Sequence, residues 1–190
     1  MNPAKRKLRL ADGVKTAQVL LDAGLDVNRE AFREGRWKAT PLWYAISRGQ
    51  NLTLARALLK AGANPNYCLW AAAFRDHVDA IRLLARSGAV IDDPASPKTP
   101  FLEAVQWSRF RAAETLLKLG ADVNFQDDQG MTALHYMLKK SSDKKHVRMV
   151  IRYGARGDLK NAAGVTGAEI LLRKRDRDLR VLGEGLSRGS

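Results

Sequence analysis

The sequence predicts an all-α fold, a solenoid of stacked helix–turn–helix units that project turns as fingers. Three observations predict it. One spacing recurs five times, with an apolar pair, then glycine three residues later, then Asn or Asp four residues after that. A threonine followed by a short apolar segment stands about 21 residues before several of these glycines. The segment that ends at each glycine has apolar residues at helical spacing. The glycines are 38, 26, 32 and 34 residues apart, and a period near 33 indicates one unit stacked on itself.

Each unit carries residues suited to begin and end its helices. The threonine signatures read Thr40-Pro41-Leu42, Thr99-Pro100-Phe101 and Thr132-Ala133-Leu134-His135, with a degenerate Thr166-Gly167-Ala168. A threonine hydroxyl caps a helix start, and the next position tolerates proline. The recurring glycine fits a left-handed helix terminus, and the Asn or Asp after it suits a turn. The glycine and Asn/Asp pairs are Gly24/Asn28, Gly62/Asn66, Gly88/Asp92, Gly120/Asn124 and Gly154/Asp158.

Together these motifs closely resemble the ankyrin repeat, whose pattern is Thr-Pro-Leu-His-x-Ala. The resemblance covers nearly the whole chain, from about Pro3 to Leu182. It implies one domain over 1–190, with a flexible tail at 183–190. The expected units are 3–28, 29–66, 67–92, 93–124, 125–158 and 159–182.

Two departures from the repeat concern its fingers. Twelve residues separate Asn28 from Thr40, whereas Asn66 is followed at once by the next helix, so a long finger stands beside a missing one. Segment 29–39 either folds over the gap and covers Tyr67 and Trp70, or leaves a notch for a partner's side chain. Both interpretations stay open.

Two further departures lie near the C-terminus. Residues 139–146 read as a basic loop between helices. Residues 173–180, with alternating charges, read as a solvated outer face of the last helix with internal pairing. The polar outer face that a closing unit needs is an equal alternative.

The single cysteine, Cys68, lies where complete signatures have proline. We expect a buried, unreactive thiol and a reducing compartment. The apolar segments are far shorter than the roughly 20 residues needed to span a bilayer. A soluble, cytoplasmic monomer is therefore expected.

Catalytic and metal-binding patterns are absent from the sequence. No Cys/His set has metal-ligand spacing, and no Gly-rich phosphate loop or nucleophile–base arrangement occurs. By resemblance, His135 ties adjacent repeats together and His77 is structural, while His146 has no companion in the sequence. We expect no enzyme activity and no cofactor.

The resemblance also implies where a partner binds, namely at the ends of the inner helices and at the finger tips. Candidates at the helix ends are Ser47, Arg48, Phe74, Arg75, Gln106, Trp107, Lys139, Lys140, Arg173 and Lys174. Candidates on the fingers are Trp37, Lys38, Lys98, Asp128, Gln129 and Met131. Exposed aromatic and Arg side chains are typical of interface hot spots. Two interpretations without partner binding also stay open. Phe74 and Trp107 could serve inter-repeat packing, and the basic residues could form a solvated face.

The net charge of +13 is unevenly distributed along the chain. Residues 1–60 carry +7, residues 61–132 carry −2, and residues 133–190 carry +8. We expect a non-catalytic protein–protein interaction module that binds a partner protein, an acidic segment, across a concave surface of inner helices and fingers. The alternative is a polyanion, nucleic acid or an anionic membrane surface, bound by the basic ends.

Overall fold

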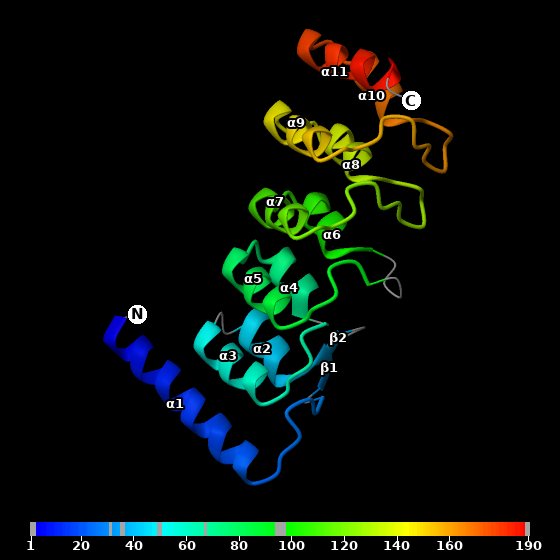
Figure 1. The fold of residues 1–190 in the computed structure, drawn as a ribbon. Helices are drawn as coiled ribbons and strands as arrows, with labels where there is room; N and C mark the ends of the chain where they lie inside the picture. The colour runs from blue at the N-terminus through cyan, green and yellow to red at the C-terminus, as the bar shows by residue number, and fades with distance from the viewer. Residues whose placement is uncertain are drawn as a thin grey trace. The chain divides into compact units, whose positions relative to one another are not determined.

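The chain forms two compact units, Met1–Val90 and Ile91–Ser190, each described by itself (Figure 1). The computed structural model describes residues 3–30, 32–34, 37–48, 51–66, 68–93 and 98–188, with side chains over 13–187 except residues 32–38. The expected division into six repeats within one domain stays a prediction.

The first unit contains one long helix, a small hairpin and two helix pairs. The long helix is α1 (Pro3–Asp22), and the hairpin joins β1 (Phe32–Glu34) to β2 (Trp37–Ala39). The pairs are α2 (Pro41–Ser47) with α3 (Leu52–Lys60), and α4 (Cys68–Phe74) with α5 (Val78–Arg86). The inner helices α2 and α4 pack on each other. Leu42, Ile46 and Leu69 are completely buried in this unit.

The second unit contains three helix pairs. They are α6 (Pro100–Gln106) with α7 (Phe110–Lys118), α8 (Ala133–Lys139) with α9 (Lys144–Arg152), and α10 (Gly167–Leu172) with α11 (Arg177–Arg188). Helix α8 packs on both α6 and α10. A Cβ atom at Gly167 would lie 2.5 Å from Leu134. The degenerate fourth signature therefore has glycine where α10 approaches α8 most closely.

The predicted helix starts and stops are confirmed. Thr40, Thr99, Thr132 and Thr166 have extended backbone, and each hydroxyl accepts a hydrogen bond from the backbone N–H three residues later. The five recurring glycines have φ between 83° and 93°, a region that side-chain-bearing residues rarely adopt.

After four of the five glycines, the side chain of the Asn or Asp reaches the next repeat, a contact that the sequence analysis did not predict. The fifth, Asp158, instead pairs with Arg156 in its own turn. The Asn28 amide donates to the Gly62 carbonyl (3.2 Å) and accepts from the Asn64 N–H (2.7 Å). Asn124 does the same with Gly154 (3.0 Å) and Arg156 (2.8 Å).

In two other repeats, the equivalent residue makes only one of these two hydrogen bonds. Asn66 accepts from the Val90 N–H at 3.0 Å, and Asp92 accepts from the Asp122 N–H at 2.6 Å. The second carboxylate oxygen of Asp92 is buried and has no hydrogen-bond partner among the described residues. Burial raises the pKa of Asp92 although the bond from Asp122 lowers it.

His135 joins two repeats, as the resemblance implied. Its ring is buried, with Nδ1 2.8 Å from the Thr132 hydroxyl and Nε2 3.0 Å from the Val165 carbonyl oxygen. The imidazole thus completes the cap of α8 and contacts the following finger.

One expectation about the second helices of the second unit was wrong. The expected basic loop over 139–146 is shorter, because Asp143 caps α9 and places Lys144, Lys145 and His146 on that helix. The His146 ring stacks on Phe110 of α7, with centroids 3.7 Å apart.

The C-terminal predictions also need correction. Residues 173–176 form a turn between α10 and α11, and α11 runs to Arg188, so residues 183–188 are helical instead of a flexible tail. A Cβ atom at Gly183 would lie 2.9 Å from Leu171, so this helix packs closely on α10.

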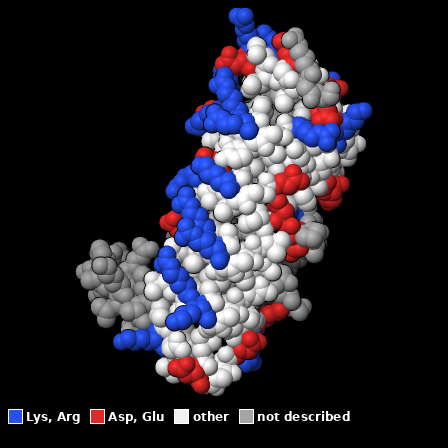
Figure 2. Space-filling model, in the orientation of Figure 1, with Lys and Arg blue, Asp and Glu red and all other residues white. Residues whose placement is uncertain are grey.

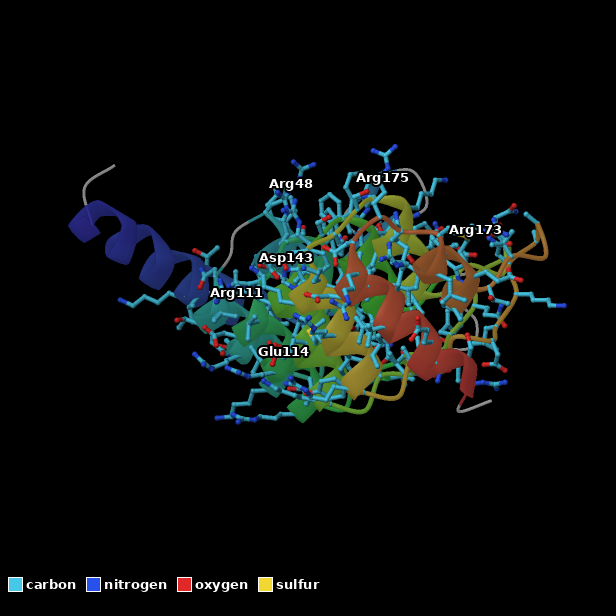
Figure 3. The ribbon with its side chains drawn as sticks, turned by 90° about the horizontal axis from the view of Figure 1, so that it is seen from above. Arg48, Arg111, Glu114, Asp143, Arg173 and Arg175 are labelled. Carbon is cyan, nitrogen blue, oxygen red and sulfur yellow. The ribbon has the colours of Figure 1, made fainter. Side chains whose placement is uncertain are left out.

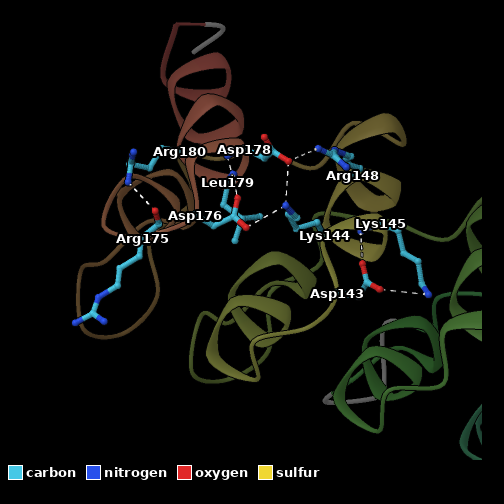
Figure 4. Close-up of polar contacts among 9 residues, drawn as sticks. All are labelled: Asp143, Lys144, Lys145, Arg148, Arg175, Asp176, Asp178, Leu179 and Arg180. Carbon is cyan, nitrogen blue, oxygen red and sulfur yellow. Dashed lines mark hydrogen bonds and ion pairs between the residues drawn. The ribbon is translucent and has the colours of Figure 1, made fainter.

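Asp176 in this turn and Asp178 in the first turn of α11 form ion pairs with α9 of the preceding repeat. Lys144 lies 3.0 Å from Asp176 and 2.9 Å from Asp178, and Arg148 lies 3.2 Å from Asp178 (Figure 4). These bonds to Lys144 lower the pKa of both carboxylates.

The long finger forms the β1–β2 hairpin, in which Phe32 pairs with Ala39 and Glu34 with Trp37. The hairpin's side chains and Tyr67 lie outside the described residues, so both interpretations of the neighbouring gap stay open.

Cys68 is completely buried at the start of α4. Burial raises the pKa of its thiol to about 12, more than a hydrogen bond with Thr40 lowers it. Because the thiolate is the reactive form, we expect labelling by a thiol reagent at pH 8 to be slow in native buffer and fast in denaturant. Rapid stoichiometric labelling of the native protein, followed by mass spectrometry, would contradict a sheltered thiol.

Asp92→Asn should stabilise the protein. An amide at this position can donate to the next repeat as Asn28 and Asn124 do, and it removes the charge of a half-buried carboxylate. We expect about 1 kcal/mol of added unfolding free energy at pH 7. The pKa of Asp92 is raised by folding, so its ionised form is the less favourable one in the native state. The gain should therefore shrink as pH falls through that pKa, where the protonated carboxyl also donates.

Denaturant titrations at pH 7 and pH 4 check this expectation. Asp128→Asn, at an exposed finger position, is the control for loss of one negative charge. Equal or lower stability of Asp92→Asn at pH 7 would refute the bridging argument.

Candidate partner-binding site

The ends of the inner helices in the second unit form equivalent positions. Counting from the capping threonine of each repeat, seven residues lead to Gln106, Lys139 and Arg173, and eight lead to Trp107, Lys140 and Lys174. Because α8 packs on both neighbouring inner helices, these residues lie in two adjacent columns.

One of the two columns contains lysines with a structural role. Lys140 donates from Nζ to the Gln106 carbonyl, and Lys174 donates to the Leu138 carbonyl at 3.0 Å. Each lysine therefore binds a carbonyl at the C-terminal end of the preceding inner helix, where the helix dipole favours a cation. The roles of Lys140 and Lys174 in partner binding stay predictions. Each lysine also makes a hydrogen bond within the protein.

The other column presents cations to solvent. Lys139 and Arg173 are exposed, and among the described residues neither forms an ion pair within 4 Å. The charge of Arg173 does act on Glu169, one turn earlier on α10, and contributes to the lowered pKa of that carboxylate. In Figure 3, Arg173 lies toward the finger turns, whereas Arg111 and Glu114 of α7 lie on the opposite side of the second unit.

Trp107 is half exposed, and its indole N–H donates to the Glu103 carboxylate. The ring is thus held in one orientation while much of its surface stays accessible. Packing between repeats does not bury this side chain.

The first unit holds the remaining predicted helix-end residues. Arg48 is exposed at the end of α2, while Ser47 is buried. Phe74 stacks on Trp70 with centroids 5.5 Å apart, and the Arg75 guanidinium lies 5.9 Å from the Phe74 ring centroid. Trp37 lies in β2, and its side chain is outside the described set.

A pocket of about 280 Å³ opens beside α8 in the second unit. Its walls come from α8 and from two successive finger turns. The lining residues are Gln129, Met131, Tyr136, Lys139, Asn161, Ala162 and Ala163.

Equivalent polar residues organise the two finger turns. The Asp127 carboxylate accepts hydrogen bonds from the backbone N–H groups of Gln129 (3.0 Å) and Met131 (2.9 Å). The Asn161 side-chain oxygen accepts from Ala163 (3.0 Å) and Val165 (3.1 Å). The Ala162 N–H donates to the Gln129 carbonyl at 2.9 Å and joins the two turns.

Tyr136 connects α8 to the first of these turns. Its hydroxyl donates to the second Asp127 oxygen at 2.6 Å. Burial, followed by this hydrogen bond, raises the pKa of Tyr136, so the phenol stays protonated and acts as a donor at neutral pH.

Sequence reasoning found only part of the pocket. It named Gln129, Met131 and Lys139 but not Tyr136 or the Asn161–Ala163 turn. Asp127 and Asn161 occupy equivalent positions in successive repeats. This equivalence could have indicated that the Asn161–Ala163 turn contributes to the pocket, because equivalent turns of successive repeats lie side by side.

Basic side chains also lie away from this site. Figure 2 shows Lys and Arg side chains at several places on the face of the second unit that is in view. The second helices contribute to this charge, since α7 ends in Lys118 and α9 in Arg152. A test of the candidate site therefore needs a control for general charge.

The described part of the chain contains neither a metal-site arrangement nor a membrane-spanning helix. No group of three or more His, Cys, Asp or Glu residues there is arranged to hold a metal ion. None of the described helices is long and apolar enough to cross a membrane.

Comparisons with known families agree with the repeat pattern. A model described as ankyrin repeats in many copies matches residues 101–151, and a model of a single ankyrin repeat matches residues 37–68. The chain is an ankyrin-repeat protein. Ankyrin repeats generally serve as protein–protein interaction modules and are typically non-catalytic.

The chain spans between 12% and 27% of the length of three curated relatives that it matches. The mouse ankyrin repeat and SOCS box protein 6 is 36% identical over 111 residues, covering 51% of this chain and 27% of that protein. The phosphocholine transferase AnkX of Legionella pneumophila is 29% identical over 139 residues, covering 67% and 14%. The Arabidopsis thaliana potassium channel AKT2/3 is 34% identical over 102 residues, covering 50% and 12%.

Substitutions of the adjacent residues Arg173 and Lys174 at the end of α10 should differ in their effect on the unfolding free energy. We expect Lys174→Met to lower the unfolding free energy by about 1 kcal/mol, because the Leu138 carbonyl loses its donor. Arg173→Met should change it by less than about 0.5 kcal/mol, as exposed substitutions usually do. Thermal unfolding of both variants checks this, and equal effects would contradict the division between the columns.

Proposed function

We propose that this ankyrin-repeat protein is a non-catalytic binding module for an acidic segment of a partner protein. In the second unit the segment lies across the inner-helix ends and finger turns, with Lys139 and Arg173 as its main charge contacts. Trp107 supplies an aromatic contact, and Lys140 and Lys174 contribute at the edge of the same surface.

The observation that carries this proposal is the environment of Lys139. This lysine lines the pocket beside α8, is exposed, and pairs with no acidic side chain within the described residues. Many cations elsewhere in the second unit do have acidic partners, including Lys118 with Glu114 (2.7 Å) and Lys145 with Asp143 (3.3 Å). An acidic ligand would supply the missing partner at the candidate site.

A polyanion is the competing ligand, because basic side chains are also present on the second helices. Binding of the two ligands differs in how the affinity depends on salt concentration and on the positions of the protein's cations. Binding of a nucleic acid falls steeply with salt in proportion to the phosphates contacted. A peptide with a few charges loses affinity less steeply, and its loss depends on where the cations lie.

The test uses a displayed library of random peptides selected on the immobilised wild-type protein. We expect the selected peptides to be enriched in Asp and Glu. Lys139→Glu with Arg173→Glu should weaken their binding at least about tenfold, because reversed charges repel the ligand. The matched control is Arg111→Glu with Arg152→Glu, which makes the same charge change at exposed positions of α7 and α9 and should retain binding.

Two outcomes would overturn the proposal. One is selection of peptides without acidic enrichment. The other is equal loss in both double variants, together with tight, salt-sensitive binding of a DNA duplex or of anionic vesicles. That result would establish the polyanion as the ligand of the basic surface in general.

A further inference from the structure

The pocket beside α8 has the size of a site for one side chain. Its volume is about 280 Å³, at the lower edge of the roughly 300–1,000 Å³ typical of small-molecule sites. It lies at the surface that the proposed function assigns to the acidic segment. A bound segment would therefore insert one residue here while the rest lies across the helix ends.

Two polar side chains of the pocket walls, Tyr136 and Asn161, are already engaged in hydrogen bonds. The Tyr136 hydroxyl donates to Asp127, and the Asn161 side-chain amide lies 3.7 Å from the Met131 sulfur while its oxygen accepts two backbone N–H groups. What these residues offer a ligand is thus mainly apolar: the Met131 thioether, the Tyr136 ring and the methyl groups of Ala162 and Ala163.

An aromatic side chain fits this lining best. A thioether contacts aromatic rings favourably, and a tyrosine ring pairs with a second ring in stacked or edge-to-face geometry. The turns that hold these groups are fixed by Asp127 and Asn161, so the walls need little reordering on binding.

Lys139 adds one charge to this apolar lining. It lies three residues after Tyr136 on α8, which places both side chains on the same side of the helix, and both line the pocket. The lining contains no acidic residue. A carboxylate next to the inserted ring would meet this ammonium group.

We propose that the pocket receives an aromatic residue of the bound segment, with an adjacent Asp or Glu paired to Lys139. This inference rests on the proposed function and adds to it a recognition motif, an aromatic residue directly beside an acidic one.

The experiment is a titration of the full chain with capped tripeptides, followed by NMR of the methionine methyl groups. The probe is acetyl-Glu-Phe-Glu-amide, which carries a carboxylate on both sides of the ring. We expect millimolar binding that shifts the Met131 methyl resonance and leaves the buried Met137 methyl unchanged. Acetyl-Glu-Ala-Glu-amide should bind at least about tenfold more weakly, because burial of the ring is lost. Acetyl-Gln-Phe-Gln-amide should bind about threefold more weakly, as expected for loss of an exposed ion pair.

Variants of the protein test the same two contacts from the other side. Ala162→Leu should fill the pocket and abolish the shift of Met131. Ala61→Leu, the same change at an exposed position after α3, should not. Lys139→Gln should weaken the Glu-containing probe to the level of the Gln-containing one and leave the latter unaffected. Lys15→Gln, at another exposed lysine, is its control.

The outcomes separate the two proposals. If selected acidic peptides bind through Lys139 and Arg173 but Ala162→Leu binds them as wild type does, the pocket inference is wrong and the proposed function stands. Equal binding of the Phe and Ala probes would also refute the pocket, and this comparison needs no variant. Shifts at Met131 that require both the ring and Lys139 would support the motif.

Discussion

Contact between one side chain and the next repeat's backbone is the constraint on which the stack depends. Asn28 and Asn124 each bind a carbonyl and an N–H group of the following repeat. A side-chain amide carries its donor and its acceptor on separate atoms, so one Asn can bind a carbonyl and an N–H group at the same time. The glycine four residues earlier is needed because its positive φ turns the chain toward that contact. The fixed spacing from glycine to Asn is therefore a rule about the interface between repeats as much as about a turn.

The local features of the fold could be predicted because each depends on a few neighbouring residues. Threonine caps, the recurring glycines and the buried Cys68 are of this kind. The bridging role of Asn28 could not be derived in the same way, since its partners lie 34 and 36 residues away. The helical end of α11 was not predicted because the resemblance to the repeat ends at Leu182. In the structure Gly183 permits close packing against Leu171.

The candidate site shows the same division between local and distant information. Sequence alone places Lys139 and Lys140 together at a helix end, and nothing in their order distinguishes them. The structure separates them because only one of two neighbouring side chains on a helix can point back along the stack to the preceding carbonyl. The pocket depends on the pairing of two turns whose residues are more than 30 positions apart, Gln129 with Ala162. That pairing follows from the repeat register and not from any single motif.

The walls of the pocket come from two successive repeats, and this has a thermodynamic consequence. A ligand that contacts Met131 and Ala162 together binds only when the two finger turns are docked side by side. By mass action, such a ligand favours the docked arrangement over any state in which the last repeat has separated. Occupancy of a small surface pocket would thereby be linked to the cohesion of the second unit's final helices, so that recognition of a short peptide also controls how firmly this end of the protein is assembled.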